Sequence, residues 1–160
     1  MAVCEGRHSI AACASFSSIS LATQSNSVAA TSENRSICKV QRAHSVAAAV
    51  GSCSVSIAQN SYSIACCTAE ESAAIALANG SIALCTENNS SVYANHKGAI
   101  ALGLGTNNRA KGLLGSLLCL LDESNGNFRM LTAVVDGKKI KPDTWYAAKN
   151  GKFVEWEEER

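Results

Sequence analysis

Eight cysteines and three histidines are the residues of this sequence that could hold a metal ion or form a reactive centre. Structural zinc sites need ligands at closely paired spacings such as Cys-x-x-Cys, and the sequence contains no such pair. It also lacks a Gly-x-Ser-x-Gly nucleophile elbow and a phosphate-binding loop that ends in Lys and Ser or Thr. We therefore predict that the protein is not an enzyme and needs neither a metal ion nor another cofactor.

The best candidate for a contact patch is the stretch VYANHKG, which combines aromatic and basic side chains. Its predicted binding residues are Tyr93, His96 and Lys97. The tryptophans Trp145 and Trp156 could stack on a sugar, but large apolar rings are also what a small core requires. We favour the second interpretation, in which both rings are buried.

The elements that position these residues follow from a nine-residue repeat. Serine occupies ten successive positions at this spacing: Ser9, Ser18, Ser27, Ser36, Ser45, Ser54, Ser63, Ser72, Ser81 and Ser90. The unit reads S-[I/V]-A-x-[A/C] and continues with four variable, mostly polar residues. Five residues with β-branched character followed by a polar stretch indicate a five-residue strand and a short turn.

The true structural repeat is 18 residues, because alternate units differ. The third position is alanine in one class of units, from Ala11 to Ala101, and varies among Ser, Cys, Ala and Val in the other. Two strands per turn would place each class on its own parallel sheet. We predict an all-β fold, a flattened parallel β-solenoid (β-roll) over residues 1–116, with about six turns between Ser9 and Ser116.

Side-chain size indicates which face points inward. Positions one, three and five of the unit hold small residues, whereas position four admits Lys39, Tyr93 and Lys111, which a thin interior could not contain. The Ile/Val position would then face outward on at least one sheet and need a partner. The predicted oligomer interface consists of Ile19, Leu21, Ile37, Val55, Ile57 and Ile75. The opposite assignment, with Ile and Val inside, would remove that need.

Most cysteines fall at the small positions of the repeat, so we interpret them as reduced, structural side chains. Cys67 and Cys85 stand one turn apart in one column, at a separation that a disulfide could also span. A polar column at 18-residue spacing consists of His8, Asn26, His44 and Tyr62. We interpret it as a solvated edge of the coil, with a binding edge as the alternative.

The composition changes after Ser116, where both tryptophans and the only proline lie. We predict that residues 117–160 form a separate antiparallel β-meander that caps the coil, since solenoids need their apolar ends covered. The expected strands are residues 117–121, 128–135, 139–141, 145–148 and 152–156. The turn Asn150-Gly151 between the last two is a typical hairpin signal.

The overall composition narrows the partners and the location. The chain is 47% hydrophobic and 17% charged, with a formal net charge of +1, which does not suggest nucleic acid or an acidic membrane surface as a partner. Serine and asparagine interrupt every apolar run before it reaches the length of a membrane span. The first residues do not resemble a secretion signal. We therefore expect a cytoplasmic protein.

Two parts of the sequence resemble known families. GAIALGLGTNNRAKG and the recurring S-[I/V]-A resemble the β-roll head of trimeric autotransporter adhesins, over residues 9–112. The segments NNRAKGLLGSLLCLL and VVDGKKIKPDTWYAAKNGKFVE resemble small uncharacterised β-solenoid proteins of gut Bacteroidota and their phages, a similarity that extends over nearly the whole chain. The first resemblance implies a trimer, and the second implies no established chemistry.

We therefore predict a non-enzymatic scaffold or protein-binding module that acts as a homo-oligomer, with a trimer favoured and a host protein as the other candidate partner. The phage resemblance implies an alternative, a counter-defence protein that inhibits a host enzyme or sequesters a small nucleotide. An ice-binding coil is a third hypothesis. It would need exposed rows of hydroxyl groups, whereas the serines are predicted to face inward.

Overall fold

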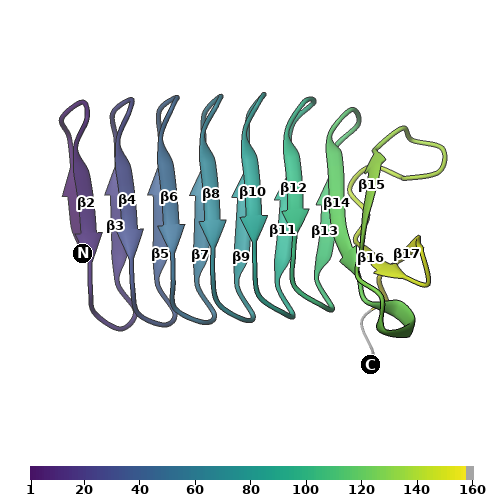
Figure 1. Ribbon diagram of the computed structural model, residues 1–160. Helices are drawn as coiled ribbons and strands as arrows, with labels where there is room; N and C mark the ends of the chain where they lie inside the picture. Colours follow the sequence, from purple (N-terminus) through teal and green to yellow (C-terminus); the bar gives the residue numbers. More distant parts are fainter. Residues whose placement is uncertain (158–160) are drawn as a thin grey trace.

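Two parallel sheets form the walls of a flattened coil in the computed structural model, which describes residues 1–157 (Figure 1). The nine-stranded sheet contains, in spatial order, β1 (Ala2–Cys4), β3 (Ile19–Ala22), β5 (Ile37–Val40), β7 (Val55–Ala58), β9 (Ala73–Ala76), β11 (Ser91–Ala94), β13 (Arg109–Gly112), β16 (Tyr146–Lys149) and β17 (Lys152–Glu155). The eight-stranded sheet contains β2 (Ile10–Cys13), β4 (Val28–Thr31), β6 (Val46–Ala49), β8 (Ile64–Cys67), β10 (Ile82–Cys85), β12 (Ile100–Gly103), β14 (Leu117–Asp122) and β15 (Arg129–Val134).

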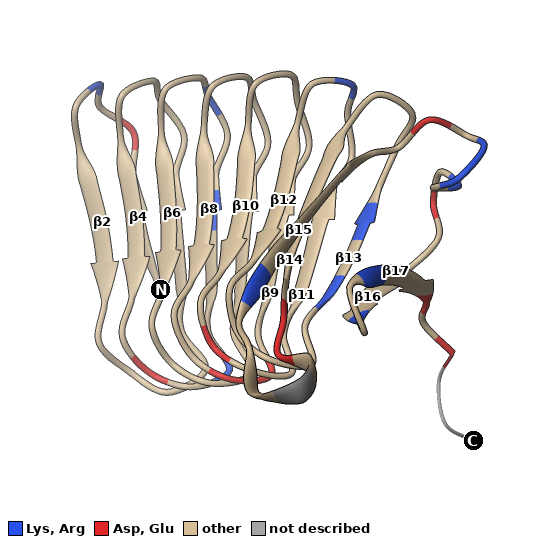
Figure 2. Cartoon of the chain, turned by 45° about the vertical axis from the view of Figure 1, so that its right-hand side comes forward, with Lys and Arg blue, Asp and Glu red and all other residues tan. Residues whose placement is uncertain are grey.

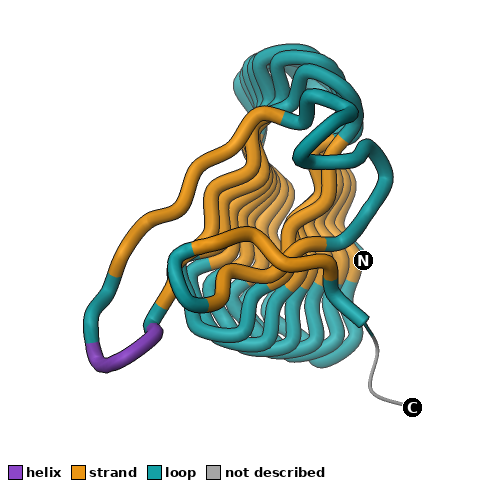
Figure 3. The backbone as a smooth tube through the Cα atoms, turned by 90° about the vertical axis from the view of Figure 1, so that its right-hand side faces the viewer, coloured by secondary structure: helices purple, strands orange, loops and turns teal. Residues whose placement is uncertain are grey.

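The predicted β-solenoid is confirmed, with about seven turns and an 18-residue repeat. Each strand pairs in parallel with the strand one turn later, as in Ile19 with Ile37 and Ile64 with Ile82. Seen end-on, the two sheets face each other across a narrow interior (Figure 3). The backbone N–H and C=O groups of each described strand in the coil therefore form hydrogen bonds with the neighbouring strands, and this pairing does not require a wide core.

The small positions of the repeat point inward, as predicted. Positions three and five are buried in successive turns, as for Ala47 and Ala49 in β6 or Ala74 and Ala76 in β9. The Ile/Val position and position four are half-buried or exposed on the outside of both sheets. The interior is therefore one side chain deep on each wall, which explains why so few large residues occur in the coil.

Strands of the coil from β2 to β13 contain four residues and not the predicted five, because the serine stays outside the ladder of strand hydrogen bonds. Its backbone N–H donates a hydrogen bond to the hydroxyl oxygen of the serine one turn later. Examples are Ser45 N–H to Ser63 Oγ (3.2 Å) and Ser63 N–H to Ser81 Oγ (3.3 Å). The Ser63 hydroxyl in turn lies 3.1 Å from the carbonyl oxygen of Arg42. Serines at both corners of the coil thus form two hydrogen-bonded ladders.

One ladder ends at Asn108, which stands where the next serine would be. Its side-chain oxygen accepts a bond from the N–H of Ser90 (2.7 Å). Its buried Nδ2 has no hydrogen-bond partner among the described residues. In the other ladder Ala99 replaces the serine, and the N–H of Ser81 bonds to the carbonyl oxygen of Ala78 instead (3.3 Å).

The residue before each ladder position turns the chain into the next strand with a left-handed backbone. Glycine, which adopts this conformation without strain, is present at Gly80 and Gly98. Gly115 also has this conformation before Ser116 (φ 81°), and the other ladder positions follow residues with side chains at φ between 54° and 59°: His8, Ser17, Asn26, Arg35, His44, Cys53, Tyr62, Glu71, Asn89 and Asn107. The rings of His44 and Tyr62 stack along this edge, with their centroids 5.5 Å apart.

The C-terminal residues extend both sheets instead of forming one meander. β14 continues the eight-stranded sheet in parallel with β12, and β15 then pairs with β14 in the antiparallel direction. The hairpin β16–β17 adds to the other sheet beside β13. The short 3-10 helix η1 (Ser124–Gly126) lies between β14 and β15.

Two details of the predicted cap are wrong. Residues 139–141 are not a strand, because the carboxylate of Asp136 accepts the N–H groups of Lys138, Lys139 and Ile140 and so curls the segment. The tryptophans are not the buried rings either. Tyr146 fills the end of the core, whereas Trp145 is half-buried and Trp156 is 37% exposed.

The serine ladder predicts the effect of Ser63→Ala. This substitution removes the acceptor for the buried N–H of Ser45 and should lower the free energy of unfolding by about 1–3 kcal/mol. Chemical denaturation measures the change. Ser15→Ala, at an exposed turn position, is the control and should change stability by less than about 0.5 kcal/mol. Equal effects of the two substitutions would contradict a stabilising role for the ladder.

The left-handed turn residues predict that Glu71→Gly stabilises the protein. A residue with a Cβ atom costs free energy in the left-handed backbone region, and glycine removes this cost. The gain should exceed the entropy cost of ordering a glycine, so the free energy of unfolding should rise by about 0.5–1 kcal/mol. Asn89→Gly, one turn later at the same edge, should gain less because asparagine tolerates positive φ. Thermal unfolding of the two variants tests this, and an equal or larger gain for Asn89→Gly would argue against it.

Candidate interaction surfaces

The outer face of the eight-stranded sheet is apolar along its length. In strands β2 to β14, all of which the structure describes, no outward side chain of this sheet is charged. The outward residues form two columns. The first contains Ile10, Val28, Val46, Ile64, Ile82, Ile100 and Leu117, and the second contains Ala12, Ala30, Ala48, Cys66, Leu84, Leu102 and Cys119. We call these two columns the apolar face.

The apolar face continues onto β15, where Met130 and Val134 are exposed and pair with outward residues of β14. Charged residues instead gather in the turns and in the C-terminal part (Figure 2). The β14–β15 hairpin bends outward from the plane of the other strands (Figure 3). An uncharged apolar surface that crosses a whole sheet is unusual for a protein that stays alone in water.

The opposite sheet has a mixed outer face. The predicted interface residues Ile19, Leu21, Ile37, Val55, Ile57 and Ile75 all lie on it, in β3, β5, β7 and β9. Lys39 interrupts them in β5, and Arg109 and Lys111 follow in β13. These six residues therefore share one face, and Lys39 and Lys111 at position four of the same class of units were the sequence signal that this face is charged and the other is not.

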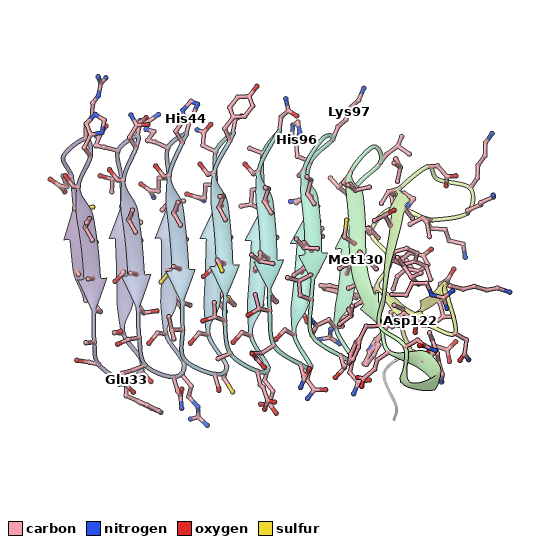
Figure 4. The ribbon with its side chains drawn as sticks, viewed as in Figure 1. Glu33, His44, His96, Lys97, Asp122 and Met130 are labelled. Atoms are coloured by element: carbon pink, nitrogen blue, oxygen red, sulfur yellow. The ribbon has the colours of Figure 1, made fainter. Side chains whose placement is uncertain are left out.

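The predicted patch around Tyr93 is divided by the fold. Tyr93 lies in β11 against Trp145, with ring centroids 6.4 Å apart, and the Lys111 ammonium is 4.6 Å from the centre of the tyrosine ring. His96 and Lys97 are exposed in the following turn, at the same edge as His44 (Figure 4). Tyr93 thus packs with the C-terminal hairpin, and the two basic residues stand in the turn.

A groove of about 660 Å³ lies between the last turns, β14 and the C-terminal hairpin. Its lining includes Asn89, Asn107 and the indole of Trp156. The guanidinium of Arg109 lies close to both tryptophan rings, 5.7 Å from the centre of the Trp156 ring and 5.2 Å from that of the Trp145 ring, and forms cation–π contacts with both. Sequence reasoning missed the groove because its walls come from segments that are far apart in the sequence.

Asp122 fastens the hairpin to the end of β14. Its buried carboxylate accepts bonds from the Ser124 hydroxyl and from the Gly151 N–H, and it forms an ion pair with Arg129 (3.4 Å). Ser124 in turn accepts a bond from the N–H of Asn150 (2.7 Å). The bond from Ser124 is the main cause that lowers the pKa of Asp122, with Gly151 and Arg129 adding to it and burial opposing it.

All eight cysteines are free thiols. Cys67 and Cys85 are buried in the interior, where the neighbouring Cys67 thiol and burial raise the pKa of Cys85. Burial likewise raises the pKa of Cys38. Among residues 1–157, no group of three or more His, Cys, Asp or Glu side chains is placed to hold a metal ion. None of the described helices is long and apolar enough to cross a membrane.

Comparison with known proteins adds no relative: no family model, curated protein or solved structure matches the chain. The two family resemblances of the sequence therefore stay expectations.

The contacts of Asp122 predict that Asp122→Ala detaches the hairpin β16–β17 and leaves the coil folded. Hydrogen exchange of residues 146–155 should become faster, with little change in β4 to β10. Glu123→Ala, at the exposed neighbouring position, is the control. The same contacts predict a pH dependence. Because the pKa of Asp122 is lower in the folded protein than in the unfolded chain, its carboxylate stabilises the attached hairpin fully above the unfolded pKa of about 3.9. This stabilisation is lost as the pH falls through the folded pKa. Protection factors of the hairpin amides that stay the same at low pH as at neutral pH would contradict this.

Proposed function

We propose that the protein is a non-enzymatic scaffold that assembles with copies of itself through the apolar face. The observation that carries the proposal is the absence of charge from all outward side chains of the described strands β2 to β14 in the eight-stranded sheet. Burial of apolar surface is the main driving force of association, and nothing on this face opposes it. The face with Lys39 would have to bury an ammonium group, which is costly without a partner charge.

The size of the apolar face suits a specific contact. Seven strands at about 4.8 Å and four residues at about 3.3 Å give a flat area of roughly 34 by 13 Å per copy. Two copies would bury roughly 900 Å² of this area, close to the lower bound of about 1,000 Å² for specific assemblies. Each coil offers one flat apolar face, so we favour a symmetric pair in which the same face is used twice. A threefold arrangement would require each copy to contribute two different surfaces.

Such a pair would be a rigid block with the mixed faces on its two outer sides. Each outer side would present Lys39, the aromatic cluster around Trp145 and the groove beside Trp156. This arrangement suits a scaffold that displays two identical surfaces to another molecule.

Ile64→Lys tests the proposal. Ile64 is 38% exposed at the centre of the apolar face, and a lysine there would bring two like charges together in the pair. We expect the dissociation constant to rise by on the order of 100-fold or more, measured by sedimentation at micromolar concentrations.

Ile37→Lys is the matched control, because Ile37 holds the same repeat position on the opposite sheet and is also 38% exposed. It should leave the assembly unchanged, and circular dichroism should show both variants folded. A wild-type protein that is strictly monomeric would overturn the proposal, as would loss of assembly in the Ile37 variant alone. A trimer that resists Ile64→Lys would point to the threefold arrangement implied by the adhesin resemblance.

A further inference from the structure

Side-chain size changes along the apolar face in a regular direction. From the N-terminal end, the second column reads Ala12, Ala30, Ala48, Cys66, Leu84, Leu102 and Cys119. Small residues occupy the first three turns and leucines the fifth and sixth, with Cys66 in the middle. The face is therefore lower at one end of the coil than at the other.

The first column repeats the pattern. After Ile10, which is large and stands at the N-terminal end, it has Val28 and Val46 before Ile64 and then Ile82 and Ile100. Both columns thus change size about the same strand, β8 (Ile64–Cys67). Two independent columns with a common centre indicate a surface shaped by a single partner and not by random apolar substitution.

A second copy with its coil reversed complements this shape. If a twofold axis runs along β8, Ala30 faces the partner's Leu102, and Ala48 faces the partner's Leu84. In the first column, Val46 faces the partner's Ile82. In these three contacts a smaller residue meets a larger one, so the gap between the two sheets stays even over β4 to β12, as close packing requires. At the ends, Ile10 faces the partner's Leu117 and Ala12 faces the partner's Cys119.

The other twofold arrangement fits less well. With the axis along the coil, equal turns would face each other and leucine would meet isoleucine at the C-terminal end. At the N-terminal end alanine would meet valine, and the two sheets would diverge. Flat sheets pack at a nearly constant separation of about 10 Å, so the reversed arrangement is the one that both columns support.

We propose that two copies pair by their apolar faces with their coils antiparallel, about a twofold axis that runs along β8 and brings the two Cys66 side chains together. This inference rests on the proposed self-assembly and specifies its register. Each N-terminal half covers the C-terminal half of the other copy, so the two C-terminal hairpins lie at opposite ends of the block.

Cross-linking at Cys66 tests the register directly. Cys53 is exposed and would react as well, so Cys53→Ser is the starting protein. A short bis-maleimide joins two thiols as thioethers, and burial raises the pKa of the Cys66 thiol, so mildly alkaline pH is used. We expect a covalent dimer with a Cys66–Cys66 link, identified by mass spectrometry, and its loss in Cys66→Ser.

Exchanging residue sizes tests the complementarity. Leu84→Ala leaves a gap opposite the partner's Ala48, and Ala48→Leu places one leucine against another. Each substitution should therefore raise the dissociation constant by about tenfold or more. The double variant restores one small and one large residue at each contact and should recover most of the affinity. Ala73→Leu, on the opposite sheet, is the control and should have no effect. Leucine occupies the position of Ala48 in other turns, as at Leu102, and isoleucine occupies the position of Ala73 in other turns, as at Ile37, so the variants should remain folded.

The outcomes separate the register from the assembly itself. A monomeric protein at micromolar concentration would overturn both. Dimers without a Cys66–Cys66 link, or a double variant no better than the worse single one, would overturn the antiparallel register and leave the self-assembly standing. A wild-type dimer that is cross-linked at Cys66 and rescued by the double variant supports both.

Discussion

At most corners of the coil, the backbone N–H of the serine points to the next turn with no strand carbonyl to receive it. The hydroxyl one turn later accepts it, as in Ser45 and Ser63, and in turn lies near a carbonyl oxygen of the previous turn. An unsatisfied buried N–H costs about 1–3 kcal/mol, and this cost would recur at most corners. The ladder therefore requires the same small hydroxyl residue at a fixed spacing, and this requirement maintains the strict repeat.

The same requirement makes the interior thin. With serine at the corners and mostly alanine, serine or cysteine on the walls, the largest inward side chains of strands β2 to β13 are Val40 and Val92, so isoleucine and leucine lie on the outer faces of these strands. A globular domain hides such residues in its core, whereas this coil can hide them only against another molecule. The apolar face thus follows from the geometry of the ladder, and the apolar face is the basis of the proposed self-assembly.

Prediction from the sequence was most successful where one residue type repeats. The 18-residue turn, the two sheets and the inward serines and alanines followed from periodicity and side-chain size. The strand length was overestimated because the role of the Ser63 N–H depends on a hydroxyl 18 residues away. The cap was misread at residues 139–141 for a similar reason, since a single carboxylate, Asp136, binds three N–H groups that the pattern had assigned to a strand.

The sequence by itself determined the period, the inward and outward positions, and therefore the existence of exposed apolar columns. These properties depend on local spacing and size, which can be read along the chain. Only the tertiary structure decided which side chains share a surface, because the stacking of turns joins residues such as Ala48, Cys66 and Leu84 that are 18 residues apart. It also placed Asp122 against Gly151 and divided Tyr93 from the turn of His96, since such contacts arise from how separate segments pack.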